Sequence, residues 1–240
     1  YKNYYTTHRL GIGYLYQTEK ANLNAGINYQ YAILDGKTSF PELDSTHRNY
    51  SNVLPNLMFN YKFSSLTNLR VVYRASTNAP SISQLQKVID NSNSLLVSIG
   101  NPLLNQEVRH FVMARYSTSN KEKTSNLFAM LFLQMTDDYI GNATFRAAND
   151  TVIYGQLVKK GRQLSIPANL SGAWSSRALV TIGLPIKPIK SNINFNTGVT
   201  YNRLPSLINA LTNTSNTYGI NLGAVLSSNI SQKLDFTLTY

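Results

Sequence analysis

The chain has 240 residues, no cysteine, and a net charge of +11 from 22 basic and 11 acidic residues. The lack of cysteine excludes a disulfide framework and thiolate-bound zinc or iron–sulfur sites. Only 14% of the residues are charged, and the basic ones are dispersed without an RNP-like aromatic motif or a basic helix, so that the net charge does not indicate nucleic-acid binding.

Ten segments alternate apolar with small polar residues, and this period of two predicts strands with two unlike faces. In the eighth segment, for example, Ile193, Phe195 and Val199 alternate with Asn194 and Asn196. Most segments have the roughly nine residues that a tilted strand needs to cross the hydrocarbon core. In chain order they are 5–18, 21–34, 50–63, 67–76, 106–117, 124–139, 172–186, 191–202, 216–229 and 232–240.

The connections between these segments alternate in length. Short turns are predicted near 19 and at 64–66, 118–123, 187–190 and 230–231, with long loops at 35–49, 77–105, 140–171 and 203–215. In outer-membrane barrels the short turns face the periplasm and the long loops face outward. The uncharged polar faces suit a hydrated lumen, and the 16 tyrosines, many near strand ends, suit the aromatic girdles at the headgroup levels. The sequence therefore predicts an all-β, antiparallel up-and-down transmembrane β-barrel.

Two strands depart from the simple pattern. Segment 124–139 is apolar on both faces, which predicts that its lumen side packs against another element, such as a plug inside the barrel. Pro55 lies inside segment 50–63, where a bulge or local break is expected because proline cannot donate to the ladder. Gly11 and Gly13 lie inside the first strand and are expected to relieve crowding in the lumen.

Several motifs resemble one family. Residues 69–74 read LRVVYR, residues 77–86 read TNAPSISQLQ and residues 100–107 read GNPLLNQE, with IPANLSG at 166–172 and GLP at 183–185. This run resembles Bacteroidetes TonB-dependent outer-membrane receptors, in which a strand ending in Tyr-Arg leads into Pro-Ser-x-x-Gln-Leu and then Gly-Asn-Pro-x-Leu-x-x-Glu. The proline that usually precedes the closing glutamate is Gln106 here.

The resemblance implies a 22-stranded barrel in the bacterial outer membrane that is plugged by an N-terminal domain and takes up a nutrient with energy from the TonB complex. With ten strands and no recognisable plug or TonB box, residues 1–240 are expected to be part of the barrel domain. The expected partners are outer-membrane lipid, the TonB complex through a plug domain outside this chain, and a surface lipoprotein at the long loops. No cofactor is expected.

Two alternatives stay open. The first is a complete small barrel that acts as a porin or an anchor, because Tyr240 is an aromatic residue on the outward face of the last strand, as in a barrel assembly signal. The missing start methionine and signal segment count against it. The second is a membrane-embedded hydrolase. His8, His47 and His110 lie far apart in the sequence and not at metal-ligand spacing, so that neither an enzyme nor a metal site is predicted.

The candidate functional residues are arginines expected to face the lumen. They would contact an anionic substrate or carboxylates of the plug. The alternative that they only balance acidic residues elsewhere in the lumen stays open. The residues are Arg70, Arg74, Arg109, Arg115 and Arg177.

Overall fold

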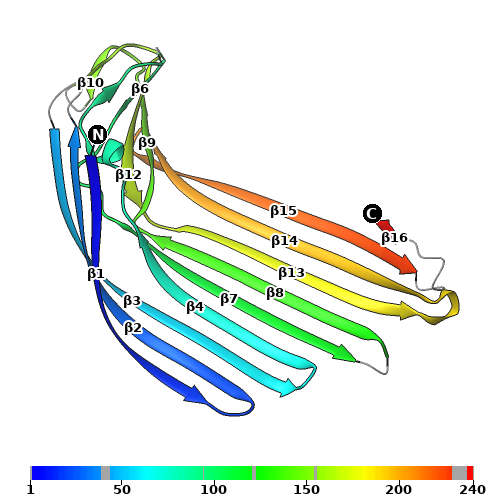
Figure 1. Cartoon of the computed structure of the whole chain (residues 1–240). Helices are drawn as coiled ribbons and strands as arrows, with labels where there is room; N and C mark the ends of the chain where they lie inside the picture. The colour runs from blue at the N-terminus through cyan, green and yellow to red at the C-terminus, as the bar shows by residue number, and fades with distance from the viewer. Residues whose placement is uncertain are drawn as a thin grey trace.

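A computed structural model describes residues 2–38, 44–93, 95–120, 123–153, 156–228 and 237–239. The described chain is almost entirely β, and its main body is one broad, curved sheet (Figure 1). Ten strands follow one another across this sheet in antiparallel pairs. They are β1 (Lys2–Gln17), β2 (Ala21–Thr38), β3 (Asp44–Ser64), β4 (Thr67–Asn78), β7 (Glu107–Asn120), β8 (Ser125–Asp137), β13 (Ala173–Ile186), β14 (Ser191–Ile208), β15 (Leu211–Ser228) and β16 (Thr237–Thr239).

These ten strands correspond to the ten predicted segments. The last is described only over Thr237–Thr239, and the turn predicted at 230–231 lies outside the described residues. The turns at 19 and 64–66 are in place, and the turn at 187–190 is the 3-10 helix η1 (Lys187–Ile189).

The sheet as described is open and mixed. Among the described strands β1 pairs only with β2, and β16 only with β15, so that barrel closure stays a prediction. The up-and-down order holds along the ten main strands, but β9 (Tyr139–Arg146) runs parallel to the end of β14, and β12 (Gln163–Leu170) runs parallel to β6 (Leu96–Ile99).

The predictions of long loops at 35–49 and 203–215 are wrong for the residues that the structure describes. The β2–β3 register continues to Thr38 opposite Asp44, and the β14–β15 register continues to Ile208 opposite Leu211. The second hairpin turns on two residues, Asn209 and Ala210, with φ of 50° and 65°, as a two-residue hairpin loop of the I′ type requires. These segments are rich in Thr, Ser and Asn and therefore look like loops, but the ladder carries their described residues on as strands.

The other two predicted loops contain helix and strand elements of their own. They lie at the end of the sheet opposite the short turns, which we call the outer end. Residues 77–105 include α1 (Ile82–Leu85), β5 (Ile89–Asp90) and β6, and residues 140–171 include β9, β10 (Thr151–Ile153), β11 (Gln156–Val158) and β12. In Figure 1 they rise above the main sheet as a separate branch. A small core of Val97, Ala147, Val158, Leu164 and Ile166 holds this branch together.

The expectation of a bulge or a local break at Pro55 is met by a break: Pro55 creates no bulge, but the ladder to β4 ends beside it. Pro55 sits in register opposite Ile27, and the register shift in β3 falls instead between Lys62 and Ser64. The β3–β4 pairing begins only at Asn56, so that Pro55 lies where the ladder to β4 ends and a missing donor costs least.

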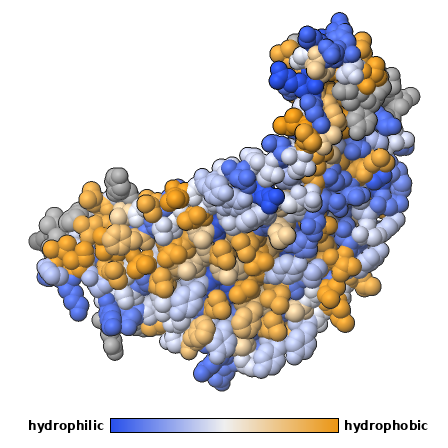
Figure 2. Space-filling view, turned by 180° about the vertical axis from the view of Figure 1, so that it is seen from behind, coloured by the Kyte–Doolittle hydropathy of each residue, from blue (hydrophilic) through white to orange (hydrophobic). Residues whose placement is uncertain are grey.

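The predicted two-faced alternation is confirmed by the register. Because residues that pair across strands share a face, the even-numbered residues of β2, β3, β4, β8 and β14 lie with the odd-numbered residues of β1, β7, β13 and β15. We call this polar side the concave face. The opposite, convex face is broadly apolar in Figure 2, and Ile12 and Leu222 on it are 80% and 77% exposed.

Aromatic side chains gather toward both ends of the convex face. Near the turns, the ring centroids of Tyr61 and Phe63 are 4.8 Å apart. Toward the outer end, Tyr201 lies 4.6 Å from Trp174 and 4.8 Å from Tyr218. Such grouping is typical of the aromatic girdles that meet lipid headgroups.

Candidate functional site on the concave face

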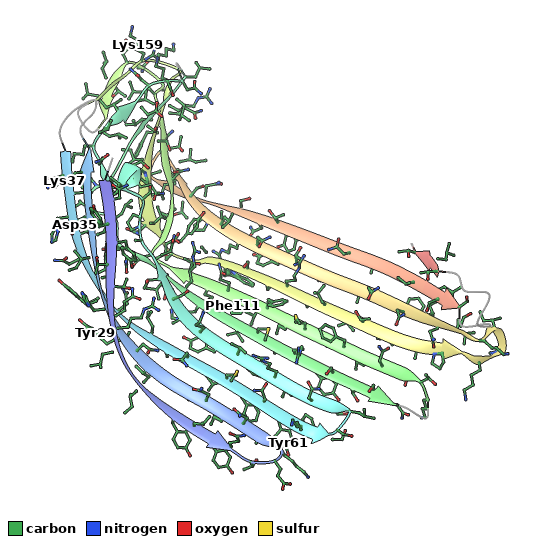
Figure 3. All side chains as sticks on the ribbon, in the orientation of Figure 1. Tyr29, Asp35, Lys37, Tyr61, Phe111 and Lys159 are labelled. Carbon is green, nitrogen blue, oxygen red and sulfur yellow. The ribbon has the colours of Figure 1, made fainter. Side chains whose placement is uncertain are left out.

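The register places all five predicted arginines on the concave face, but not in one cluster. Arg70 is directly opposite Arg115, Arg74 is opposite Phe111, Arg109 is opposite Ser76, and Arg177 is opposite Phe132. In Figure 3, Phe111 marks the middle of this face; Tyr61, on the convex face, marks the turn end of the sheet, and Lys159 marks the tip of the outer branch. Arg109 lies toward the outer end, whereas Arg70 and Arg115 lie toward the turns.

The arginines differ in their partners. Arg109 Nη2 donates to Glu107 Oε2 at 2.7 Å. For this residue the contact is therefore the one expected if the arginines balance acidic residues of the chain itself. Arg70 Nη2 lies 3.5 Å from the Met58 sulfur, a weak acceptor. Arg74 and Arg177 are exposed. Among the described side chains, none of the arginines other than Arg109 forms an ion pair with a carboxylate.

An apolar patch lies among these arginines. Phe128, Met130 and Phe132 of β8 all lie on the concave face and are only partly buried, as the apolar character of both faces of segment 124–139 predicts. The Phe132 ring centroid is 6.1 Å from that of Phe111. Both rings border a cavity of about 470 Å³ that Arg177 also lines. The concave face therefore combines apolar surface with cationic groups.

The outer end of the concave face is partly covered by α1. Ile82 and Leu85 of α1 pack with Leu34 and Tyr50 of the sheet in a buried core. The helix begins at a capping box, in which Ser81 Oγ accepts from the Gln84 backbone N–H and the Gln84 side chain accepts from the Ser81 backbone N–H. The part of the predicted outer loop that contains α1 thus folds inward over the first strands.

Gln106 and Glu107 connect this segment to the sheet. The Gln106 amide donates to the Tyr5 hydroxyl at 2.7 Å and accepts from Asn52 Nδ2 at 2.9 Å. Buried Glu107 accepts from Asn78 Nδ2 and from the backbone N–H of Ile140, both at 3.0 Å, as well as from Arg109. The sequence indicated Gln106 only as a departure from a motif, because its partners are distant in the chain.

A second cavity, of about 590 Å³, opens beside α1 at the outer end. Its lining is mainly neutral and polar, with Ser81, Gln84 and Asn142 among its residues. Its one carboxylate is Asp90, whose pKa lies below the usual value because the Ser92 backbone N–H and hydroxyl donate to it. This cavity offers many hydrogen-bonding groups and little charge.

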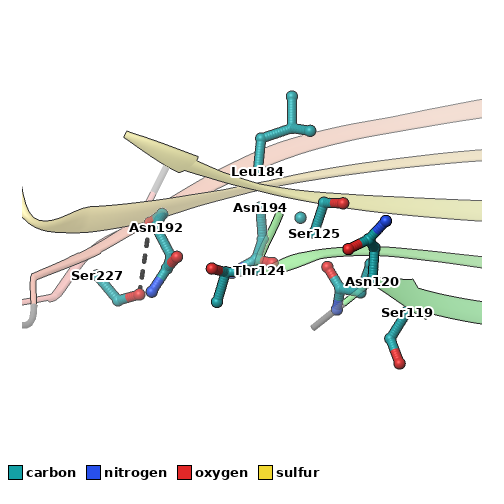
Figure 4. Close-up of a pocket in the computed structure, with 10 residues that line it drawn as sticks. Ser119, Asn120, Thr124, Ser125, Leu184, Asn192, Asn194 and Ser227 are labelled. Carbon is teal, nitrogen blue, oxygen red and sulfur yellow. Dashed lines mark hydrogen bonds between the residues drawn. The ribbon is translucent and has the colours of Figure 1, made fainter. Parts of the chain in front are cut away.

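A third cavity, of about 420 Å³, lies at the turn end of β7, β8, β13 and β14 (Figure 4). Ser119, Asn120 and Asn194 are among its lining residues, and the Ser227 hydroxyl donates to the Asn192 carbonyl oxygen at 3.4 Å. Its side chains are almost all uncharged amides and hydroxyls, as expected of a hydrated lumen.

Two of the histidines lie close to carboxylates. His47 lies 2.6 Å from Asp35, and His110 is bonded to the Tyr73 hydroxyl at 2.8 Å and lies 3.2 Å from Asp137. No serine hydroxyl bonds to either ring within the described ranges. No group of three or more His, Asp and Glu that could hold a metal ion is found among the described residues.

Comparison with known proteins places the chain in a family. The model of the outer membrane protein beta-barrel family matches residues 8–240. The chain belongs to this family. It is therefore a protein of the bacterial outer membrane. In the part of the chain that the structure describes, no helix has the length and hydropathy to cross a bilayer. Among curated proteins, none matches the sequence.

Solved structures of receptors share the fold. The hemophore receptor HasR of Serratia marcescens, a double mutant in complex with its hemophore HasA and heme, has a TM-score of 0.68 at 15% identity over 98% of this chain and 43% of its own. The ferric enterobactin receptor PfeA of Pseudomonas aeruginosa, a G324V mutant, has a TM-score of 0.53 at 11% identity over 99% of this chain and 40% of its own. The siderophore receptor PirA of the same organism has a TM-score of 0.51 at 12% identity over 99% of this chain and 48% of its own. The chain thus spans less than half the length of these receptors.

Proposed function

We propose that this chain forms part of the barrel wall of a TonB-dependent outer-membrane receptor that takes up a nutrient. Membership of the outer-membrane β-barrel family and the shared fold with receptors for heme and siderophores support the proposal. So does the resemblance of the GNPLLNQE segment to Bacteroidetes receptors of this type. The remaining strands, a plug and the TonB box would lie elsewhere in the polypeptide.

The observation that carries the proposal is the chemistry of the concave face. Phe128, Met130 and Phe132 would lie in water if this face lined an open channel, and exposed apolar surface costs about 25 cal/mol per Å². A plug inside the barrel would cover them. Larger transporters of this architecture carry such a plug.

The arginines of the same face fit contact with anionic groups. Arg74 and Arg177 are exposed, and Arg70 and Arg115 have no carboxylate partner among the described side chains. Guanidinium groups bind carboxylates and phosphates in a bidentate manner. We assign these four residues to an anionic solute or to acidic groups of the plug. Arg109 has its own partner in Glu107 and serves to position that residue.

The outer branch and the convex face suggest the partners. The convex apolar band and its aromatic groups would contact outer-membrane lipid. The outer branch, which ends near Lys159, would meet solute first and offers a docking surface for a surface lipoprotein (Figure 3).

A binding screen and a conductance measurement on the full-length protein test the proposal. We expect one class of nutrient to bind the purified protein and its channel to stay closed in planar bilayers, because a plug fills it. The alternative of a small porin predicts steady conductance without a ligand, and that result would contradict the proposal.

A further inference from the structure

Four described side chains have a buried nitrogen or oxygen atom without a hydrogen-bond partner, and three of them lie in one row of the sheet. The three atoms are Asn22 Oδ1, Arg70 Nε and Arg115 Nε. The register joins them through Asn60, because Asn22 is opposite Asn60, Asn60 is opposite Arg70, and Arg70 is opposite Arg115. We call Asn22, Asn60, Arg70 and Arg115 the arginine row.

The row places two like charges side by side. Directly opposite residues of an antiparallel pair have Cβ atoms about 5 Å apart, and like charges there destabilise the sheet. The next residues on either side are Gln17, opposite Asn22, and Met130, opposite Arg115. Neither the row nor these two neighbours carries a carboxylate. The single hydrogen bond from the Arg70 side chain goes to the Met58 sulfur, and Arg115 donates to no side chain within the described residues.

Space for a ligand adjoins the row. A cavity of about 400 Å³ is lined by Asn22, Asn60 and Arg115 of the row, together with Lys62. Glu19, in the β1–β2 turn, also lines the cavity but forms no ion pair with Arg115 or Lys62. Cationic groups, amide groups and open volume therefore meet at the turn end of the concave face.

We propose that the arginine row is a binding site for an anionic oxygen group, a carboxylate or a phosphate. A planar guanidinium presents paired N–H donors that match two oxygens of such a group. An anion between Arg70 and Arg115 would offset their repulsion and accept from the terminal N–H groups of the guanidinium planes. The Asn22 amide nitrogen can donate to the same anion.

The anion has two possible sources with the same chemistry: a free solute, or a carboxylate from another part of the same polypeptide. This proposal depends on the proposed function in one respect only, namely that the concave face lines the lumen. It does not require transport, so that its test uses stability and leaves uptake aside.

The test is thermal unfolding of the full-length protein in detergent, for wild type, Arg70→Gln and Arg115→Gln, with and without inorganic phosphate. Arg203→Gln is the charge-matched control, because Arg203 is exposed and on the other face. A phosphate-dependent rise in the wild-type midpoint that exceeds the rise in both row variants supports a free anion. Phosphate generally stabilises proteins by exclusion from their surface, and only the difference between variants is counted.

The second source gives a different result. If a carboxylate of the polypeptide fills the site, phosphate has no specific effect, and both row variants unfold several degrees below wild type while Arg203→Gln does not. Arg115→Lys keeps the charge but not the paired donors, so that its unfolding midpoint should lie between those of wild type and Arg115→Gln. It also allows the measurement if Arg115→Gln does not fold. The proposal is overturned if phosphate has no specific effect and the row variants unfold at or above the wild-type midpoint, because an unfilled pair gains stability when its repulsion is removed.

Discussion

The Gln106 amide donates a 2.7 Å hydrogen bond to the Tyr5 hydroxyl across a separation of 101 residues. The same side chain accepts from Asn52, so that one buried amide joins β1 and β3 to the start of β7. The position that departs from the family motif is therefore a structural link at the outer end of the concave face.

Replacing Gln106 with alanine should lower the stability of the protein. The change leaves Asn52 and Tyr5 without their partner, and the free energy of unfolding should fall by about 1–3 kcal/mol. Gln106→Pro, which introduces the residue usual in the motif, should cost at least as much. Chemical denaturation with Gln17→Ala as an exposed control measures the effect; equal midpoints for Gln106→Ala and the control would refute the role of the link.

Gly100 should not tolerate a side chain. A Cβ atom there would lie 2.8 Å from the backbone oxygens of Ser83 and Gln84, and backbone cannot move aside cheaply. We expect Gly100→Ala to displace residues 79–106, to cost about 1–3 kcal/mol, and to speed proteolysis of that segment.

Gly13→Ala is the matched control for this change. Its Cβ would meet nothing closer than the Ala25 oxygen at 3.6 Å, an ordinary contact. If the two variants are cleaved at the same rate, the close packing of Gly100 against α1 is not important for stability.

Adjacent residues on β15 should respond in opposite ways to a charge. Leu222 is on the convex face and Asn221 on the concave face. Leu222→Lys places an ammonium in lipid and should cost about 2–4 kcal/mol if it lies near the midplane. Asn221→Lys should change the unfolding free energy by less than about 1 kcal/mol. Reversible folding of the full-length protein into vesicles measures both, and similar costs would show that the two faces are assigned wrongly.

Local pattern was sufficient to predict the main strands. The alternation from Leu23 to Ile33, for instance, depends only on neighbouring residues, and the structure has the expected face at each position. The faces of the five arginines followed from the same parity, and so did the apolar concave side of β8. What each of these residues contacts in the complete protein is still a prediction.

Non-local contacts account for what could not be predicted. The extension of β14 to Ile208 depends on its pairing with β15, and the strand β12 depends on β6 and β9, so that polar segments without clear alternation became strands. The inward fold of α1 depends on Leu34 and Tyr50, far away in sequence. The arginine row emerges only when the register of four strands is known.

Uptake by whole cells tests the central claim most directly. A nutrient that binds the full-length protein should be taken up by cells with a working TonB complex, and uptake should fall to background when TonB is deleted, because a plugged barrel opens only with that energy. Equal uptake with and without TonB would contradict the account and would favour a porin.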